Sequence, residues 1–164
     1  MRLRDSFLGA FAAITLAATS AVAATGFSAN LTGTAENPPV STAASGAATC
    51  VLNNAGTQLQ ISVAFQNLTT AYSASHIHGY AAAGSNASVK FGFASVLTNA
   101  NRNGTFNGVW NLTATDATNL LAGLMYVNIH SSTFPGGELR GQLIQDQSVA
   151  ARNTSWGRMK ALYR

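Results

Sequence analysis

All three histidines of this 164-residue chain fall in two short segments. His76 and His78 flank Ile77 in the first segment, and His130 follows Ile129 in the second. Residues two apart in a β-strand point to the same face, so His76 and His78 are expected to project together, away from Ile77. His130 is likewise expected to leave the apolar side of its strand. The spacing therefore predicts three imidazoles on the polar faces of two strands.

If these two strands are neighbours, three nitrogen donors converge. Neutral imidazole binds both Cu²⁺ and Zn²⁺, and copper binds more tightly to an unspecialised nitrogen site. The sequence therefore predicts a metal site formed by His76, His78 and His130, with a copper ion as the first candidate and a zinc ion as the second. The alternative is that the ring nitrogens hydrogen-bond backbone loops and hold one end of the domain together.

A charged pair follows the second histidine segment. After a Pro-Gly-Gly turn, Glu138, Arg140 and Gln142 are expected to share one face of a strand, opposite Leu139 and Leu143. Charged side chains are rarely buried unless they are paired. Two interpretations stay open: Glu138 and Arg140 form a surface ion pair, or one of them orients a histidine through a hydrogen bond.

The elements that carry these residues are mostly strands, because alternation with period two dominates the sequence. Asn- and Gly-rich stretches at 53–56 and 101–104 predict two hairpin turns. The expected strands, about eight in number, are 27–33, 46–52, 59–65, 73–78, 89–93, 106–112, 125–130 and 138–144.

One short helix is expected at 116–122, with Thr115 or Asp116 as its N-cap and Gly123 at its end. Short strands at close spacing are typical of an antiparallel sandwich or barrel. The fold class is therefore all-β, a Greek-key-like antiparallel β-sandwich of about eight strands with one short helix.

The two ends of the chain differ from the middle. Residues 1–23 combine a positively charged start, an apolar run and a small-residue stretch, which predicts a cleaved signal peptide. No later segment is apolar over the ~20 residues that a spanning helix needs, so we expect a secreted or periplasmic protein with no transmembrane segment in its mature chain. Residues 146–164 are rich in basic side chains and predict a flexible tail, disordered or in a short helix; a contact with an anionic surface or partner is the alternative.

The charge and the cysteine content limit the kinds of partner that we expect this chain to bind. Residues 27–145 hold three basic and three acidic side chains, so this part of the chain has no footprint for nucleic acid. Cys50 is the only cysteine, so no internal disulfide can form. Its thiol is expected to be buried, to bond another molecule or to bind a metal.

Four ordered motifs resemble the CHRD domain, a repeat first named from chordin. The resemblance runs from about residue 26 to 144, and it implies a β-sandwich of extracellular or periplasmic proteins with no generally established activity. At one position this chain departs from the family pattern, because Asn37 replaces an apolar residue before the two prolines. The motifs are 27–33 with 36–40, 75–79, 123–130 and 136–143.

A fainter likeness concerns the copper–zinc superoxide dismutases, which also place a His-x-His on a sandwich strand and a later histidine before a Gly-rich segment. On that analogy His76, His78 and His130 hold copper. The bridging histidine and the zinc-binding loop of that family have no counterpart, because the chain has no other histidine. The likeness therefore excludes a dinuclear dismutase and leaves a mononuclear copper site open.

Three functions remain: a metal-binding exported protein, an adhesion or interaction module that binds an envelope or matrix protein, and a mononuclear copper redox enzyme. The acidic residues are scattered among unlike segments, and no histidine is left to activate a nucleophile, which argues against hydrolysis. We expect a CHRD-type binding protein rather than an enzyme, with copper as its ligand.

Overall fold

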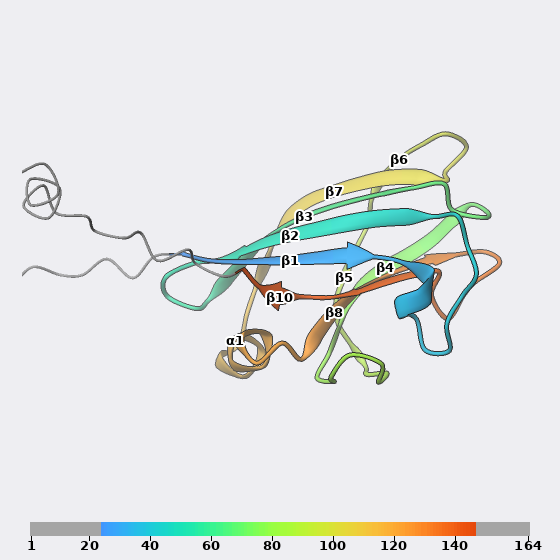
Figure 1. Ribbon diagram of the computed structural model, residues 1–164. Coiled ribbons are helices and arrows are strands. Elements are labelled where there is room, and N and C mark those ends of the chain that lie inside the picture. The colour runs from blue at the N-terminus through green and yellow to red at the C-terminus, as the bar shows by residue number, and fades with distance from the viewer. Residues whose placement is uncertain (1–23, 147–164) are drawn as a thin grey trace, which may run out of the picture.

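The computed structural model describes residues 24–146, which form two antiparallel sheets packed face to face (Figure 1). The six-stranded sheet has the order β10-β1-β2-β3-β7-β6 and the four-stranded sheet the order β5-β4-β8-β9. The first comprises β10 (Ile144–Gln145), β1 (Thr25–Leu31), β2 (Ser45–Leu52), β3 (Gln58–Gln66), β7 (Asn103–Asn111) and β6 (Val96–Thr98). The second comprises β5 (Val89–Phe93), β4 (Tyr72–Gly79), β8 (Met125–Ser131) and β9 (Leu139–Gln142).

The predicted β-sandwich is confirmed, but the described residues hold ten strands rather than about eight. The short edge strand β6 was not predicted, and its hairpin with β7 turns at residues 99–102, slightly before the expected 101–104. The strand expected at 138–144 divides at Leu143, whose side chain is fully buried. On either side of it, β9 and β10 belong to different sheets, so the chain crosses the sandwich at this residue.

The core lies between the sheets and follows from the alternation in β2 and β3. Leu59 and Ile61 point inward from β3 and are almost inaccessible to solvent, as is Ile129 on the facing sheet. Complete burial of such a side chain contributes about 1.5–3 kcal/mol. Cys50 lies in the same core, 2% exposed, and burial raises the pKa of its thiol to about 12. Of the three roles open to this cysteine, the buried one is therefore correct.

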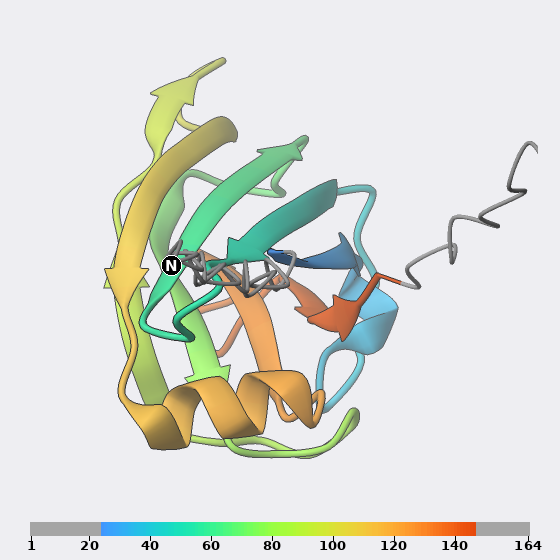
Figure 2. The same ribbon diagram turned by 90° about the vertical axis from the view of Figure 1, so that its left-hand side faces the viewer.

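The helix α1 (Ala114–Leu121) crosses one end of the sandwich (Figure 2). It begins earlier than the predicted 116–122, and Thr113, rather than Thr115 or Asp116, is its N-cap. The Thr113 hydroxyl accepts a hydrogen bond from the backbone N–H of Asp116, while the Asp116 carboxylate accepts one from the backbone N–H of Thr113. This capping box satisfies two free donors of the first turn. Gly123 follows the helix with φ +70°, so its end agrees with the prediction.

The strand β8 is buried along its whole length, on both faces. Its inward face packs in the core, and its outward face is covered by the chain that follows η1 (Gly33–Ala35) and by the connections at 80–88 and 132–138. His130 on this strand therefore lies beneath loops rather than on an open sheet surface, and His76 and His78 on the neighbouring β4 are half-buried.

The predicted signal peptide (1–23) and all but the first residue of the predicted basic tail (146–164) lie outside the described residues. Within 24–146, the helices fall short of the length and apolar character that crossing a membrane requires.

Candidate metal centre

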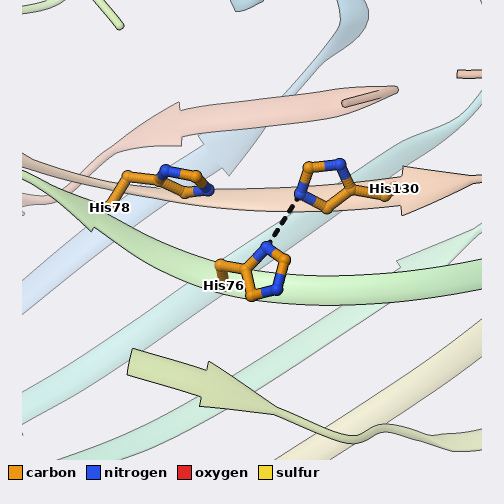
Figure 3. A group of neighbouring side chains, drawn as sticks. All are labelled: His76, His78 and His130. Carbon is orange, nitrogen blue, oxygen red and sulfur yellow. Dashed lines mark hydrogen bonds between the residues drawn. The ribbon is translucent and has the colours of Figure 1, made fainter. Parts of the chain in front are cut away.

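The three histidines come together because β4 and β8 are hydrogen-bonded neighbours. In their antiparallel register Ala74 faces His130, and His76 faces Asn128, so His76 and His130 are diagonal neighbours on one face. One nitrogen from each of the three rings lies within 4.8 Å of the other two. Figure 3 shows the three rings turned toward a common centre. The predicted convergence of His76, His78 and His130 is confirmed.

Backbone carbonyls fix two of the rings. Nδ1 of His78 lies 2.9 Å from the carbonyl oxygen of Ala87, and Nδ1 of His130 lies 2.9 Å from that of Pro135. A carbonyl oxygen only accepts, so each Nδ1 must carry the hydrogen. A neutral imidazole has one N–H, and Nε2 of both rings therefore keeps a free lone pair.

The third ring completes the set. Nδ1 of His76 lies 3.0 Å from Nε2 of His130 (Figure 3). Because Nε2 of His130 is an acceptor, Nδ1 of His76 donates in this arrangement. A metal ion between these nitrogens would replace that hydrogen, and the proton of His76 would move to its own Nε2. The candidate ligand atoms are thus Nδ1 of His76 and Nε2 of both His78 and His130.

Nε2 of His78 is buried and has no hydrogen-bond partner. A buried acceptor without a partner costs about 1–3 kcal/mol, and such atoms are rare in folded proteins. The ring cannot avoid this cost by turning over, because its Nδ1 is held by Ala87. A cation bound by all three rings would satisfy the atom.

The pKa of each histidine is lower than its ordinary value of 6.5. Burial lowers the pKa of His130 to about 4, assisted by the charges that His76 and His78 would carry. Burial is also the main cause for the other two, with a further contribution from His78 on His76 and from Arg140 on His78. The three rings are therefore neutral at pH 7, the form in which imidazole binds a metal.

Comparison with protein families agrees with this fold and these motifs. The CHRD domain model matches residues 27–143. The chain belongs to the CHRD family. Comparison with curated proteins and with solved structures gives no match.

Glu138 and Arg140 of this CHRD domain do not share a face, contrary to the prediction, because β9 begins only at Leu139. The Glu138 carboxylate bonds Ser131, whereas the Arg140 guanidinium lies over the ring of Tyr126. These two β8 residues point to opposite faces. Both charged side chains are almost completely buried, so the surface ion pair is wrong as well.

The hydrogen bonds of the Glu138 carboxylate go to three hydroxyl groups and one backbone amide. Ser131 donates at 2.5 Å and Thr42 at 2.6 Å, and Thr69 donates from both its hydroxyl and its backbone N–H at 2.8 Å. Glu138 thus ties two loops to the end of β8. The groups that orient the rings of His78 and His130 are the carbonyls of Ala87 and Pro135.

Arg140 reaches the histidines through an aromatic ring. Its Cζ lies 3.5 Å from the centroid of Tyr126, whose ring stacks on His78 at 5.0 Å and 4° between planes. The guanidinium donates to the side-chain oxygen of Asn86 at 2.9 Å and to the carbonyl of Ser85 at 2.6 Å. Arg140, Tyr126 and His78 therefore form a continuous stack beside the centre.

Sequence reasoning missed Tyr126, although its alternation with Asn128 and His130 places it on the histidine face. It also missed Glu36, which is 6% exposed and receives two hydrogen bonds at 3.2 Å from the Asn128 amide. Burial raises the pKa of Glu36 to about 7, although the positive charge of Arg140 and the hydrogen bonds oppose this. No sequence signal marks the carbonyl of Ala87 as a partner of His78, because any residue type carries one.

Proposed function

We propose that this CHRD-domain protein binds a single copper ion through Nδ1 of His76 and Nε2 of His78 and His130. The observation that carries the proposal is the buried, unpartnered Nε2 of His78, held toward the other two rings by the bond from Nδ1 to Ala87. A purely structural histidine would be expected to use both of its ring nitrogens.

Copper is the preferred ion because the cluster offers three imidazole nitrogens and neither a thiolate nor a carboxylate. Divalent copper exceeds zinc in affinity at nitrogen sites of no special geometry. Zinc is the second candidate, since three histidines with an open fourth position are also a known zinc arrangement.

The proposal includes export. CHRD domains are typically extracellular, and the start of the chain has the composition of a signal peptide. Outside the cytoplasm the three histidines do not have to compete for copper with the thiols of a reducing compartment. We propose a protein that captures or carries copper there, because no carboxylate belongs to the cluster as an acid or base for catalysis.

An interaction module with structural histidines is the second candidate. It is favoured by the bonds of His78 and His130 to loop carbonyls, which would hold the loops even without a metal. The two functions make different predictions for a histidine substitution: it abolishes copper binding if the histidines are ligands, and it has no effect on copper binding if they are only structural.

The test is a titration of the purified protein with Cu²⁺, followed by visible and electron paramagnetic resonance spectra, with Zn²⁺ in parallel. We expect one ion per chain with nitrogen ligation, and a loss of affinity of at least about a hundredfold in His78→Ala and His130→Ala. Gln60→Ala, an exposed polar change on β3, is the control and should bind like the unmodified protein. Equal copper binding by the histidine variants would contradict the proposal.

A further inference from the structure

Arg140 is the largest fully buried side chain of the described residues, and its guanidinium has an unusual environment. Its hydrogen bonds go to uncharged oxygens of Ser85 and Asn86, and its flat face lies on Tyr126. A buried charge without a bonded counter-charge is costly, so such a position calls for an explanation.

The surroundings of the centre supply little negative charge. All three ligands are neutral imidazoles, and the carboxyl group that interacts with Arg140 is Glu36. With its pKa raised to about 7 by burial, Glu36 carries only part of a charge at neutral pH.

We propose that the centre selects monovalent over divalent copper, and that Arg140, acting through the ring of Tyr126, sets this preference. The inference rests on the proposed function, since it names the oxidation state of the ion that the three histidines bind. Arg140 is a positioning and charge-setting residue here, and it touches neither the ion nor its ligand atoms.

The physical reason is electrostatic. A fixed positive charge repels a divalent ion twice as strongly as a monovalent ion at the same place. Tyr126 is 2% exposed and its ring contacts both the guanidinium and His78, so water screens this interaction less than it would screen one between exposed groups. The neutral ligands add no charge that would compensate the second positive charge of Cu²⁺.

Ligand geometry acts in the same direction. Cu²⁺ prefers a square-planar or tetragonal set of nitrogen and oxygen ligands. Here three nitrogens come from two adjacent strands, and the bonds from His78 to Ala87 and from His130 to Pro135 restrain two of the rings. Three donors, two of them restrained, suit an ion of low coordination number better than one that needs four ligands in a plane.

The experiment measures two dissociation constants on the full protein. Cu⁺ affinity is measured without oxygen by competition with bicinchoninate, with ascorbate as the electron donor that converts Cu²⁺ to Cu⁺. Cu²⁺ affinity is measured by competition with nitrilotriacetate. We expect Cu⁺ to bind at least about a hundredfold more tightly than Cu²⁺. Equal affinities, or tighter Cu²⁺ binding, would overturn the inference and leave the proposed function intact, whereas failure to bind either ion would overturn the proposed function.

Matched variants test the role of Arg140. Arg140→Gln removes the charge and is expected to lower the preference for Cu⁺ about tenfold, which is 59 mV for a one-electron couple. Arg140→Lys keeps the charge and should stay close to the unmodified protein. A purely structural role would weaken both ions together and leave their ratio unchanged. That result would overturn the assignment.

Glu36→Gln provides a test of opposite sign that does not alter the guanidinium. At pH 8 the Glu36 carboxyl is largely ionised, because its pKa is about 7. Its replacement removes a negative charge near Arg140, so the preference for Cu⁺ should rise about threefold. The Asn128 amide can still donate to the glutamine oxygen, which protects the fold. A fall in the preference would contradict the inference even if Arg140→Gln failed to fold.

Discussion

The strands β3 and β8 share an alternating sequence pattern, but their outward faces lie in different environments. Each alternates apolar residues with polar ones, with Leu59 and Ile61 inward on β3 and Val127 and Ile129 inward on β8. The outward polar residues of β3 are exposed throughout, whereas every residue of β8 is buried. Alternation therefore tells which face turns to the core, and it does not tell whether the other face meets water.

Loops from distant parts of the sequence make the difference. Glu36 is bonded by Asn128, the Pro135 carbonyl accepts from His130, and the Ala87 backbone N–H donates to the hydroxyl of Tyr126. The outward face of β8 is thus a buried polar layer. Desolvation there shifts pKa values and leaves ring nitrogens free for a metal, which an open polar face like that of β3 cannot do.

The largest effect on stability should come from Glu138, which anchors loops over the end of β8. Glu138→Ala leaves donors of Thr42, Thr69 and Ser131 without an acceptor, and bonds to charged groups contribute about 1.5–3 kcal/mol each. We expect the free energy of unfolding to fall by about 3 kcal/mol or more, measured by urea denaturation. A loss below about 1 kcal/mol would show that the loops cover β8 without this carboxylate.

The pH dependence of stability tests whether Glu138 is ionised when it binds these donors. Burial alone would raise the pKa of Glu138, but the bonds from Ser131, Thr42 and Thr69 lower it below the ordinary value of 4.5. Its contribution is then complete above about pH 4.5 and is lost as the pH falls through the lower folded-state pKa. Glu138→Gln should be less stable at pH 7, and the difference should shrink in acid. A constant difference would argue against an ionised Glu138.

A paired substitution compares the two outward faces directly. Asn128→Ala on β8 removes the bonds to the buried Glu36 and should cost about 1–3 kcal/mol in the free energy of unfolding. Gln60→Ala on β3 changes an exposed side chain and should stay within about 0.5 kcal/mol of the unmodified protein. Urea denaturation of both variants provides the measurement. If both variants lose the same free energy of unfolding, the outward faces of β3 and β8 do not differ in the way that their burial implies.

The smallest expected effect concerns the pH dependence of the metal-free protein. The folded-state pKa of His130 is about 4, below its ordinary value of 6.5, so the unfolded chain binds the proton more readily. The stability from neutral His130 is therefore present above about pH 6.5 and is lost as the pH falls toward 4. We expect a loss of about 1–2 kcal/mol across this window, reduced by partial solvent screening.

Thermal unfolding at several pH values measures this loss, and His130→Gln, which has no such titration, is the control. Bound copper should oppose the loss, because it occupies the lone pair that the proton needs. An equally steep acid dependence in His130→Gln would assign the effect to other groups.

Much of the fold was predictable because its signals are local. The alternation of β2 and β3, the turn between them and the two histidine segments follow from neighbours in the sequence. The errors occurred where local signals compete or are short. Thr113 lies just before α1 and Thr115 in its first turn, and only the reciprocal bonds of Thr113 and Asp116 decide which residue is the cap. The three-residue strand β6 is too short to show a period.

The candidate site was predictable in its ligands and not in its surroundings. His76 and His78 share a face by spacing alone, and His130 joins them because β4 pairs with β8. The faces of Glu138 and Arg140 were mispredicted, since the strand that was to align them begins one residue later, at Leu139. The stack of Arg140 on Tyr126 depends on the sheet register, which places residues far apart in the sequence together.

By itself, the sequence determined that this chain is an antiparallel β-protein of the CHRD family and that three imidazoles leave the polar faces of two strands. These properties depend on period-two geometry and on residue type. The tertiary structure alone decided that His130 is buried and that His76 and His78 are half-buried, which of the ring nitrogens are free, and that a guanidinium stacks on Tyr126 beside them. Burial and charge proximity arise from contacts between distant segments, and these contacts set the pKa values and the electrostatic potential at the centre.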